Sequence, residues 1–405
     1  MADRHVDHLL IGGGIAAATC AATLRAEGAT GSILLAGREL DPPYHRPPAT
    51  KEYLRGAASK DDALIQPETW WSEHDVELLT RTNVMALDPE AKTAKVGKEE
   101  VSYGTALVAT GAMIRRLPVD GSDLDGIHYI RALGNADSIR KDVEEAERVV
   151  LVGGSYIGCE VAASLTEMGK RCTIVMQEDE PLSRGFGSHA GRAVRALLEE
   201  HGIEVLGGAD VERFAGEGRV AAVVLAGGRE VPADAVVCGT GATPDVMLAR
   251  KSGLPVGDTG GVRCTAQLAV EGFEGLYAAG DMCEYDSVVH GGPVRIEHEE
   301  VAAAQGATVA RNMLGQGVVH DVVPYFWSDL ADWCTLEYVS GGSSFDDEIV
   351  VGDPGSGSWG VWYLAGERVK ACLSVGGGVD LERARTLIRS NEQVAAGDLR
   401  VASGA

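Results

Sequence analysis

The chain has 405 residues, of which 45% are hydrophobic and 24% are charged, and its formal net charge is −24. This length predicts two or three globular domains, and the negative charge argues against nucleic acid or an anionic membrane surface as a partner. The sequence has no apolar run long enough to span a bilayer. Its first residues lack the apolar core of a signal peptide, so we expect a cytoplasmic protein.

The cysteines and histidines predict no metal site. Eight cysteines are scattered along the chain and no two form a C-x-x-C pair, so we expect neither a disulfide framework nor a zinc site. Cys20, Cys159 and Cys172 fall within apolar helix or strand patterns, where buried thiols are expected. His5 and His8 stand near the N-terminus without a further ligand nearby and are interpreted as a solvated pair.

The first functional pattern is a glycine turn between a strand and a helix. Residues 6–11 are apolar enough for a buried strand, residues 12–17 read Gly-Gly-Gly-Ile-Ala-Ala, and residues 18–27 predict a helix. This order is typical of dinucleotide binding. Gly12 permits the tight turn, Gly14 lets the backbone approach a pyrophosphate, and Ala16 and Ala17 allow close helix packing next to free N–H groups.

The same pattern returns later in the chain. Residues 150–158 read Val-Leu-Val-Gly-Gly-Ser-Tyr-Ile-Gly and repeat residues 9–17, with Ser155 in place of the middle glycine. The helices that follow the two turns also align with each other, because Gly28 and Gly169 occupy equivalent positions of the repeat. Two nucleotide sites in one chain indicate a flavin at one and a nicotinamide at the other.

Two further segments follow the first fingerprint. Glu39 lies about twenty residues past the glycines, where an acidic residue usually binds the adenosine ribose, and Arg38 is a candidate neighbour of the adenine. A solvated surface pair is the alternative. Next, four prolines in residues 41–54 stiffen the chain before Lys51, where a helix begins. Lys51 is either a cation held beside a flavin or part of a rigid surface loop.

The fingerprint, its repeat and the Pro-Tyr-x-Arg-Pro-Pro-x-x-Lys-Glu-Tyr-Leu segment at residues 43–54 together resemble the oxygenase-coupled NADH–ferredoxin reductases. That family includes putidaredoxin and rubredoxin reductases and the relatives of apoptosis-inducing factor. The resemblance implies an α/β, glutathione-reductase-like fold, with two Rossmann-like (three-layer ββα) dinucleotide-binding domains and a C-terminal α+β domain. It places the FAD-binding domain at residues 1–115 and 243–322, the NAD(H)-binding domain at 116–242 and the last domain at 323–405.

The resemblance also implies the residues that bind each cofactor. Beyond the first glycine turn, the resemblance implies five further contacts with FAD. These are the backbone of the strand at Val84, the end of the strand over residues 103–111, an arginine that binds the phosphates, the Ala-Ala-Gly-Asp turn, and the start of a helix over residues 301–314. The FAD set is Gly12, Gly14, Ala16, Ala17, Arg38, Glu39, Lys51, Val84, Thr110, Gly111, Arg131, Gly280, Asp281 and Glu299. The NAD set is Gly153, Ser155, Tyr156, Ile157, Gly158, Glu178 and Gly241.

The implied chemistry is a relay through two cofactors. NADH gives a hydride to the flavin, beside which Lys51 and Glu160 are expected to form a catalytic ion pair. A glutamate in the first turn of a helix is also stabilised by the helix dipole. Electrons then pass singly to a [2Fe–2S] ferredoxin or a rubredoxin that serves a cytochrome P450 or a Rieske oxygenase. Glu178 follows the strand at residues 172–175, and no Arg or Lys comes after it until Arg184, so we expect NADH rather than NADPH.

Competing functions remain at this stage. Disulfide reductases are set aside, because there is no cysteine between Cys20 and Cys159. Glu299 stands where ferredoxin-coupled members often carry a tryptophan or another large residue. The Arg-Ile-Glu-His sequence before it is more similar to that of apoptosis-inducing-factor relatives. An NADH-responsive redox sensor and an NADH oxidase therefore stay as alternatives. The sequence identifies neither the acceptor protein nor the terminal oxygenase, and it leaves a monomer and a homodimer equally open.

Overall fold

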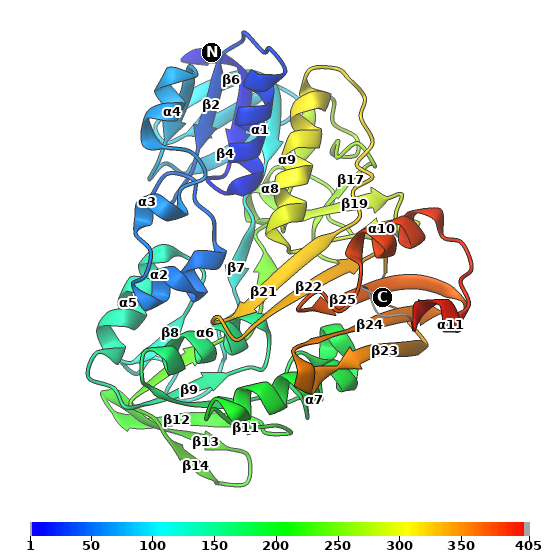
Figure 1. Cartoon of the computed structure of the whole chain (residues 1–405). Helices are drawn as coiled ribbons and strands as arrows, with labels where there is room; N and C mark the ends of the chain where they lie inside the picture. Colours follow the sequence, from blue (N-terminus) through cyan, green and yellow to red (C-terminus); the bar gives the residue numbers. More distant parts are fainter. Residues whose placement is uncertain (1, 343, 401–405) are drawn as a thin grey trace. The chain divides into compact units, whose positions relative to one another are not determined.

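The computed structural model describes residues 2–342 and 344–400, and the chain divides into two compact units. Unit 1 contains residues 1–45, 64–113 and 243–326, and unit 2 contains residues 46–63, 114–242 and 327–405. The chain passes between the units several times, twice within short strands (Figure 1). These strands are β7 (Ala112–Ile114) and β16 (Ala242–Pro244).

Unit 1 is built on a mixed sheet whose centre is parallel. Its strand order is β3-β2-β1-β6-β5-β4, and β18 also pairs with β6. The pairs among β1, β2, β3, β6 and β18 are parallel, whereas β4 and β5 are antiparallel additions at the edge. The strands are β1 (Arg4–Ile11), β2 (Ile33–Ala36), β3 (Val76–Leu79), β4 (Val84–Asp88), β5 (Thr93–Val96), β6 (Glu99–Val108) and β18 (Leu276–Ala278).

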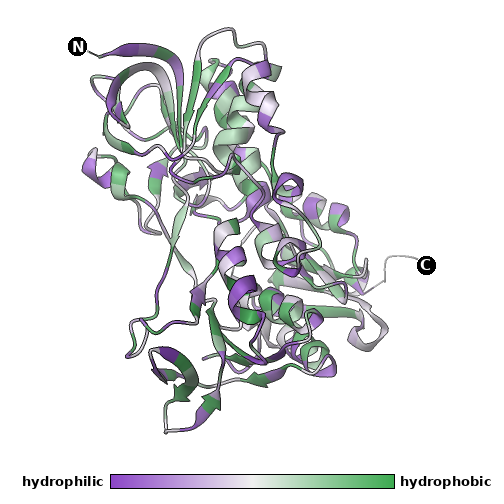
Figure 2. Cartoon of the chain, turned by 90° about the vertical axis from the view of Figure 1, so that its left-hand side faces the viewer, coloured by the Kyte–Doolittle hydropathy of each residue, from purple (hydrophilic) through white to green (hydrophobic). Residues whose placement is uncertain are grey.

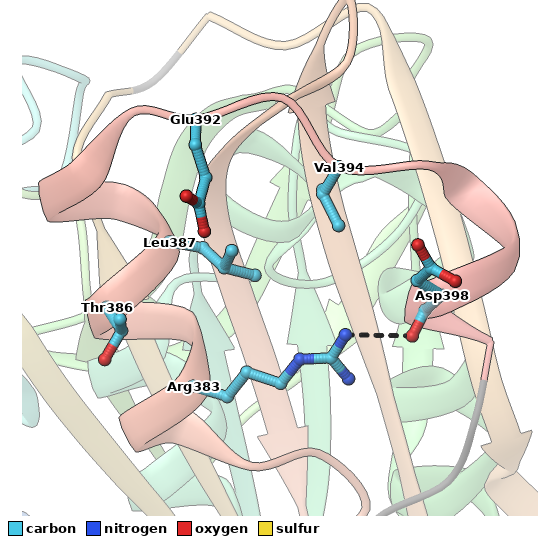
Figure 3. Close-up of a pocket in the computed structure, with 6 residues that line it drawn as sticks. All are labelled: Arg383, Thr386, Leu387, Glu392, Val394 and Asp398. Carbon is cyan, nitrogen blue, oxygen red and sulfur yellow. Dashed lines mark hydrogen bonds between the residues drawn. The ribbon is translucent and has the colours of Figure 1, made fainter.

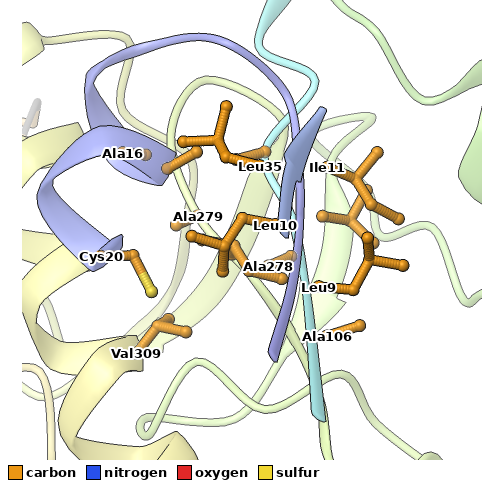
Figure 4. Close-up of a cluster of buried hydrophobic side chains, with 14 of the residues drawn as sticks. Leu9, Leu10, Ile11, Ala16, Cys20, Leu35, Ala106, Ala278, Ala279 and Val309 are labelled. Carbon is orange, nitrogen blue, oxygen red and sulfur yellow. The ribbon is translucent and has the colours of Figure 1, made fainter. Parts of the chain in front are cut away.

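Two helices of unit 1 lie side by side and pack on this sheet (Figure 1). They are α1 (Ile15–Ala26) and α9 (Glu299–Met313). The helices run in the same direction, because Ala16 in the first turn of α1 lies against Gly306 in the middle of α9, and Cys20 farther along α1 lies against Met313 at the end of α9. Small residues make this close approach possible, and Figure 4 shows how leucines of β1 and alanines of β6 and β18 fill the core beneath.

The remaining elements of unit 1 are short. A three-stranded sheet has the order β17-β19-β20. The elements are α4 (Glu68–Glu73), α8 (Met247–Lys251), β17 (Val262–Cys264), β19 (Cys283–Ser287) and β20 (Gly292–Val294).

Unit 2 repeats the strand–turn–helix pattern in a second parallel sheet. Its order is β11-β10-β9-β15-β8, and every pair in it is parallel. An antiparallel sheet, β12-β13-β14, follows in the sequence. The elements are η1 (Pro47–Thr50), α2 (Glu52–Arg55), α3 (Lys60–Ala63), β8 (Ile127–Tyr129), α5 (Leu133–Val143), β9 (Arg148–Val152), α6 (Tyr156–Glu167), β10 (Arg171–Val175), α7 (Ser183–Glu200), β11 (Glu204–Leu206), β12 (Val211–Glu217), β13 (Arg219–Leu225), β14 (Glu230–Pro232) and β15 (Ala235–Cys238).

The end of the chain forms an antiparallel sheet of order β21-β22-β25-β24-β23. Strands β24 and β25 form a hairpin that turns at residues 366–367, and α10 packs against β25. The elements are β21 (Tyr325–Leu330), β22 (Cys334–Ser340), β23 (Asp347–Asp353), η2 (Pro354–Ser356), β24 (Ser358–Ala365), β25 (Arg368–Val375), α10 (Leu381–Ser390) and α11 (Ala396–Leu399).

Hydrophobic and hydrophilic residues alternate along the helices in Figure 2, as expected of helices with one buried side. Within the described residues, no helix combines the length and apolar character needed to cross a membrane. The cysteines predicted to be buried, Cys20, Cys159 and Cys172, are buried free thiols. Burial raises the pKa of the Cys172 thiol to about 11, which keeps it protonated and unreactive at neutral pH.

Candidate functional site: two glycine turns and a buried ion pair

The first glycine turn, residues 12–14, connects β1 to α1 in unit 1. Gly12 has a φ of +128°, and a Cβ there would lie 2.1 Å from the carbonyl oxygen of Ala109, so a side chain has no room. Around Gly14, by contrast, a Cβ would meet nothing within 4 Å. Gly14 is the residue before α1, and no side chain among the described residues caps it. The first N–H groups of a helix have no partner within the helix, and an uncapped first turn of this kind is what an anion site requires.

The second glycine turn, residues 153–155, has the same geometry in unit 2. Gly153 has a φ of +111°, and a Cβ there would lie 2.5 Å from the carbonyl oxygen of Gly239. Gly158 packs equally tightly, because its Cβ would lie 2.0 Å from the carbonyl oxygen of Gly153. Ser155 precedes α6 in an extended conformation, as Gly14 precedes α1. The sequence repeat is thus a repeat of backbone geometry.

Some side chains at the second glycine turn pack against other residues, whereas others are exposed. Ser155 Oγ donates a hydrogen bond to the carbonyl oxygen of Gly239 at 3.2 Å, so the hydroxyl braces the turn. Tyr156 stacks edge-on against Phe186 of α7, with ring centroids 5.5 Å apart. Ile157 is 37% exposed in the first turn of α6, an unusual place for a large apolar side chain. An apolar residue beside a phosphate-sized anion site suits the face that a nucleotide covers.

The Gly280–Asp281 turn lies at the starts of α1 and α9. A Cβ on Gly280 would meet the Cβ atoms of Ala16 at 3.7 Å and Ala302 at 3.8 Å. The Gly280 N–H donates to Gln305 Oε1 at 2.7 Å, and Arg295 donates to the carbonyl oxygen of Asp281 at 2.9 Å. These bonds fix the turn beside the first glycine turn, so the FAD residues predicted in these two segments come together in unit 1.

The residues predicted for the adenosine end of FAD are held by partners that the sequence analysis did not identify. Arg38 binds the carboxylate of buried Asp245, with Nη1 and Oδ2 2.9 Å apart. The hydroxyl of Tyr44 donates to the carboxylate of Glu39. Thr110 Oγ1 donates to the carbonyl oxygen of Asp245 at 2.6 Å. Asp245 thus links the two segments in which Arg38 and Thr110 stand.

Val84 and Gly111 occupy the turns at the ends of unit 1 strands. Val84 begins β4, and its partner across the sheet is Val96 of β5. Gly111 follows β6 with a φ of +69°, and its carbonyl oxygen accepts a hydrogen bond from the N–H of Asp245 at 2.8 Å.

Glu299 begins α9 and is paired with a histidine from the proline-rich segment. His45 Nδ1 and Glu299 Oε1 are 2.7 Å apart. The hydrogen bond to Glu299 raises the pKa of His45 above its usual value. The neighbouring His298 packs on Phe326, with ring centroids 4.8 Å apart, and burial lowers the pKa of His298 to about 4. The start of α9 therefore carries one histidine that gains a proton readily and one that stays neutral.

Lys51 and Glu160, the predicted catalytic pair, meet in unit 2. Lys51 Nζ and Glu160 Oε2 are 2.7 Å apart, and the two side chains are only 5% and 7% exposed. Thr50 and Ser328 each donate a hydroxyl hydrogen bond to the Glu160 carboxylate at 2.6 Å. Lys51 Nζ also lies 4.9 Å from the centroid of the Trp327 ring, within the range of a cation–π interaction. A buried ion pair needs this many partners to offset its desolvation.

Three partners of this pair were not predicted: Thr50, Ser328 and Trp327. Ser328 and Trp327 lie in β21, and the contact between residues 160 and 328 joins segments far apart in the chain. Sequence gave no signal for Thr50 beyond its position next to Lys51.

The remaining predicted residues lie in turns of unit 2. The carbonyl oxygen of Arg131 accepts a hydrogen bond from Arg46 Nη1 at 2.9 Å, and its N–H donates to Asn135 Oδ1 at 3.1 Å. The carbonyl oxygen of Gly241 accepts a hydrogen bond from the N–H of Arg115 at 3.1 Å. Glu178, beyond β10, forms an ion pair with Arg184, the first basic residue after it in the sequence.

An open pocket of about 770 Å³ lies elsewhere in unit 2, between α10 and α11 (Figure 3). The guanidinium of Arg383 donates to the carbonyl oxygen of Asp398 at 2.9 Å and so ties the two helices together. None of the predicted site residues lines this pocket, whose lining is Arg383, Thr386, Leu387, Glu392, Val394 and Asp398.

Two family models match the chain. Residues 6–306 match the pyridine nucleotide-disulphide oxidoreductase family, and residues 325–403 match the reductase C-terminal family. The 5,5'-dehydrodivanillate O-demethylase ferredoxin reductase subunit of Sphingobium sp. is 32% identical over 96% of this chain and 95% of its own length. The rubredoxin-NAD(+) reductase of Pseudomonas putida is 32% identical over 84% of this chain and 88% of its own length.

Solved structures give the same result. The ferredoxin reductase for the CYP199A2 system of Rhodopseudomonas palustris superposes with a TM-score of 0.92 and 28% identity, over 98% of this chain and 97% of that one. Putidaredoxin reductase, in its covalent complex with putidaredoxin, also has a TM-score of 0.92 and 28% identity, over 99% of this chain and 96% of that one. The comparisons confirm the family resemblance and the α/β fold class predicted from the sequence.

Proposed function

Because the chain belongs to the pyridine nucleotide-disulphide oxidoreductase family, we propose that it is an FAD-dependent NADH:ferredoxin reductase. Its role is to pass electrons from NADH through FAD to a small iron–sulfur protein that serves a P450 or Rieske oxygenase. The observation that carries this proposal is the pair of matching glycine turns, each followed by a helix that receives no side-chain cap from the residue before it. One chain thus has a place for each of two dinucleotides.

FAD fits the first glycine turn. The space around Gly14 admits a pyrophosphate, and the Gly280–Asp281 turn stands beside it at the start of α9. When bound, FAD supplies the step between a two-electron hydride donor and a one-electron acceptor. Arg38, Glu39 and Val84 are proposed to bind the adenosine end, and Arg131 to bind the phosphates. Thr110, Gly111, Lys51 and Glu299 complete the proposed FAD set.

NADH is proposed to bind the second glycine turn through Gly153, Ser155, Tyr156, Ile157 and Gly158. Ser155 supports this role by bracing the turn, since its hydroxyl bonds to Gly239. Gly241 and Glu178 are proposed to contact the rest of the coenzyme. The corresponding domain division is residues 1–115 and 243–322 for FAD, 116–242 for NAD(H) and 323–405 for the C-terminal domain.

Lys51 and Glu160 are proposed as the catalytic pair for hydride transfer. Glu160, which accepts hydrogen bonds from Thr50 and Ser328, holds the Lys51 ammonium at one position. A fixed cation of this kind stabilises negative charge that develops during hydride transfer. Burial strengthens the effect, because water screens the charge less.

The acceptor is proposed to be a [2Fe–2S] ferredoxin or a rubredoxin, and the reductase a monomer or homodimer in the cytoplasm. Electron transfer from the flavin to a redox-active cysteine, as in the family's disulfide reductases, is excluded because no cysteine lies between Cys20 and Cys159, and both of these are buried.

Anaerobic stopped-flow mixing tests the proposal. The purified protein with bound FAD is mixed with NADH, and the reduced protein is then mixed with a [2Fe–2S] ferredoxin or a rubredoxin. Rapid bleaching of the flavin followed by reduction of the iron–sulfur protein is expected. A protein that holds no FAD, or whose flavin NADH does not reduce, would contradict it. Flavin reduction that yields a long-lived complex without ferredoxin reduction would favour the redox-sensor alternative, which the carboxylate at Glu299 supports.

A further inference from the structure

The hairpin of β21 and β22 is hydrogen-bonded to helix α6 at two points. Ser328 of β21 donates its hydroxyl to the Glu160 carboxylate at 2.6 Å. Trp333, in the turn between the two strands, donates its indole N–H to Glu167 Oε1 at 2.9 Å. Glu160 and Glu167 lie on the same face of α6, about 10 Å apart along its axis, because two helical turns separate them. The hairpin therefore follows one face of α6.

Trp333 is also held by the residue that follows α7. Its ring stacks on the ring of His201, with centroids 3.8 Å apart and an angle of 14° between the two planes. His201 Nδ1 lies 2.9 Å from the carbonyl oxygen of Leu197. A carbonyl oxygen can only accept, so Nδ1 is the donor and the histidine ring is fixed in turn. One indole thus connects the ends of α6 and α7 to the hairpin.

Strand β21 needs such an anchor, because it is an edge strand. In the sheet of order β21-β22-β25-β24-β23, it pairs with β22 alone among the described strands, so no second strand fixes its position. Yet β21 carries Trp327, which contacts Lys51, and Ser328, which contacts Glu160. The Ser328 hydrogen bond is 2.6 Å long, and a displacement of about 1 Å would break it.

We propose that Trp333 is a positioning residue for hydride transfer. By tying the hairpin to α6 and α7, it keeps Trp327 and Ser328 on the buried ion pair. The inference rests on the proposed function. Trp333 acts through β21, because its partner Glu167 lies two helical turns farther along α6 than Glu160.

The rest of the C-terminal sheet has contacts of its own with α7. Tyr338 of β22 packs on Phe186 of α7, with ring centroids 5.0 Å apart. The hydroxyl of Tyr363, in β24, donates to the carbonyl oxygen of Phe186 at 2.7 Å. Removal of the Trp333 indole is therefore expected to loosen β21 and its turn without unfolding the sheet. A change confined to β21 distinguishes positioning from a general loss of stability.

Hydrogen exchange of the oxidised, FAD-loaded protein, followed by mass spectrometry, tests this without turnover. In Trp333→Ala, peptides that cover β21 should exchange about fivefold faster than in the wild type, while peptides that cover β24 should be unchanged. Trp333→Phe retains a stacking ring but lacks the N–H donor, so its exchange should be intermediate. Unchanged exchange in β21, or equal acceleration in β21 and β24, would overturn the inference.

Single-turnover reduction by NADH measures the consequence for the reaction. Trp333→Ala should lower the limiting rate of flavin reduction by about three- to tenfold and change the Kd of NADH by less than about twofold. In a double-mutant cycle with Ser328→Ala, the two losses of rate should not multiply, because Trp333 acts through the position of Ser328. An unchanged rate in Trp333→Ala, or losses that multiply, would contradict the positioning role.

Trp70→Ala is the matched control. Trp70 of α4 makes the same kind of stack in unit 1, on His74, with ring centroids 4.2 Å apart and an angle of 17° between the planes. This variant should leave the exchange of β21 unchanged, and acceleration of β21 in it would also count against the inference. Failure of the proposed function gives a different result, in which NADH does not reduce the flavin of the wild type.

Discussion

At the scale of single residues, the clearest feature is how many groups converge on Glu160. Its two carboxylate oxygens accept hydrogen bonds from Thr50 and Ser328 and pair with Lys51. Two hydroxyls and one ammonium, from the adjacent residues 50 and 51 and from the distant residue 328, thus surround a single buried anion. Such an arrangement holds the Lys51 ammonium in place, which a flexible surface lysine cannot achieve.

Lys51→Ala should both slow the reaction and destabilise the fold. The variant leaves the Glu160 carboxylate buried without its counter-charge, and the free energy of unfolding should fall by about 3 kcal/mol. Urea denaturation measures this change. In single-turnover reduction by NADH, the rate should fall at least tenfold while the bound FAD per protein stays the same.

Lys60→Ala is the comparison, because Lys60 lies in the same segment but its side chain is 41% exposed. Neither its stability nor its rate of flavin reduction should change appreciably. If Lys51→Ala reduces its flavin as fast as the wild type, Lys51 has no catalytic role, whatever its effect on stability.

At the scale of elements, helix α9 supports the proposed FAD site through its contact with α1. Gly306 allows this contact, since a Cβ there would lie 2.2 Å from the carbonyl oxygen of Ala16. The starts of the two helices and the Gly280 turn between them are thereby held together. The fold of this region depends on close backbone packing rather than on large side chains.

Gly306→Ala should therefore destabilise unit 1 and weaken FAD binding. The added methyl group forces α1 and α9 apart, which is expected to cost about 1–3 kcal/mol. Thermal unfolding and FAD titration of the apoprotein measure the two effects. Gly134→Ala is the control, because Gly134 lies in α5 with nothing within 4 Å of its Cβ position. That helical substitution should be neutral or stabilising, and equal behaviour of the two variants would contradict the packing argument.

His320, which follows α9, should make the stability of the fold sensitive to acid. It is buried, Thr308 of α9 lies within hydrogen-bonding distance at 3.1 Å, and burial lowers its pKa from 6.5 to about 4. Between pH 6.5 and 4 the unfolded chain binds a proton that the folded chain does not. The free energy of unfolding should therefore fall as the pH is lowered through this window, by about 3 kcal/mol for this histidine.

Urea denaturation at pH 7 and pH 4 tests this, with His320→Phe as the variant. The variant lacks the titrating group, so it should lose less stability than the wild type over the same interval. Subtracting the two pH profiles removes the contribution of every other titrating group that the substitution leaves unchanged. Parallel profiles would show that His320 does not titrate in this range.

At the scale of the whole molecule, the two units have separate cores. One hydrophobic cluster comprises residues of unit 1, and another comprises residues of unit 2 around β9, β13 and β15. A cofactor bound to one unit stabilises that unit first, by an amount that depends on its concentration and affinity.

Removal of FAD should accordingly affect unit 1 more than unit 2. Hydrogen exchange followed by mass spectrometry is expected to show faster exchange in α1 and α9 of the apoprotein, with much smaller changes in α6 and α10. Added FAD should restore the protection and raise the Tm. Equal loss of protection in both units would contradict the assignment of FAD to unit 1.

The sequence predicted the long elements well and the short ones poorly. It predicted a helix at residues 301–314, and the observed helix α9 spans Glu299–Met313. It did not predict β3 between α4 and β4, because a strand of four residues is too short to show a clear alternation of hydrophobic and polar residues. Whether such a short strand forms depends less on the strand propensities of its own residues than on pairing with the neighbouring strand β2.

What the sequence determined by itself was the two glycine turns, each between a strand and a helix, and the family to which the chain belongs. Glycine spacing between a strand and a helix is a local pattern, so it can be recognised without knowledge of the fold. The carbonyl groups that exclude a side chain at Gly12 and Gly153 belong to the distant residues Ala109 and Gly239. The sequence also put Lys51 and Glu160 forward as a pair, on the resemblance alone.

Tertiary structure decided which side chains hold these residues. Ser328 on Glu160, Asp245 on Arg38 and Arg184 on Glu178 are contacts that no spacing rule announced. The first two join distant segments, and the third depends on how the chain turns between β10 and α7. Hydrogen bonds and ion pairs act over a few ångströms in space, whatever the separation along the chain, so only the folded chain specifies them.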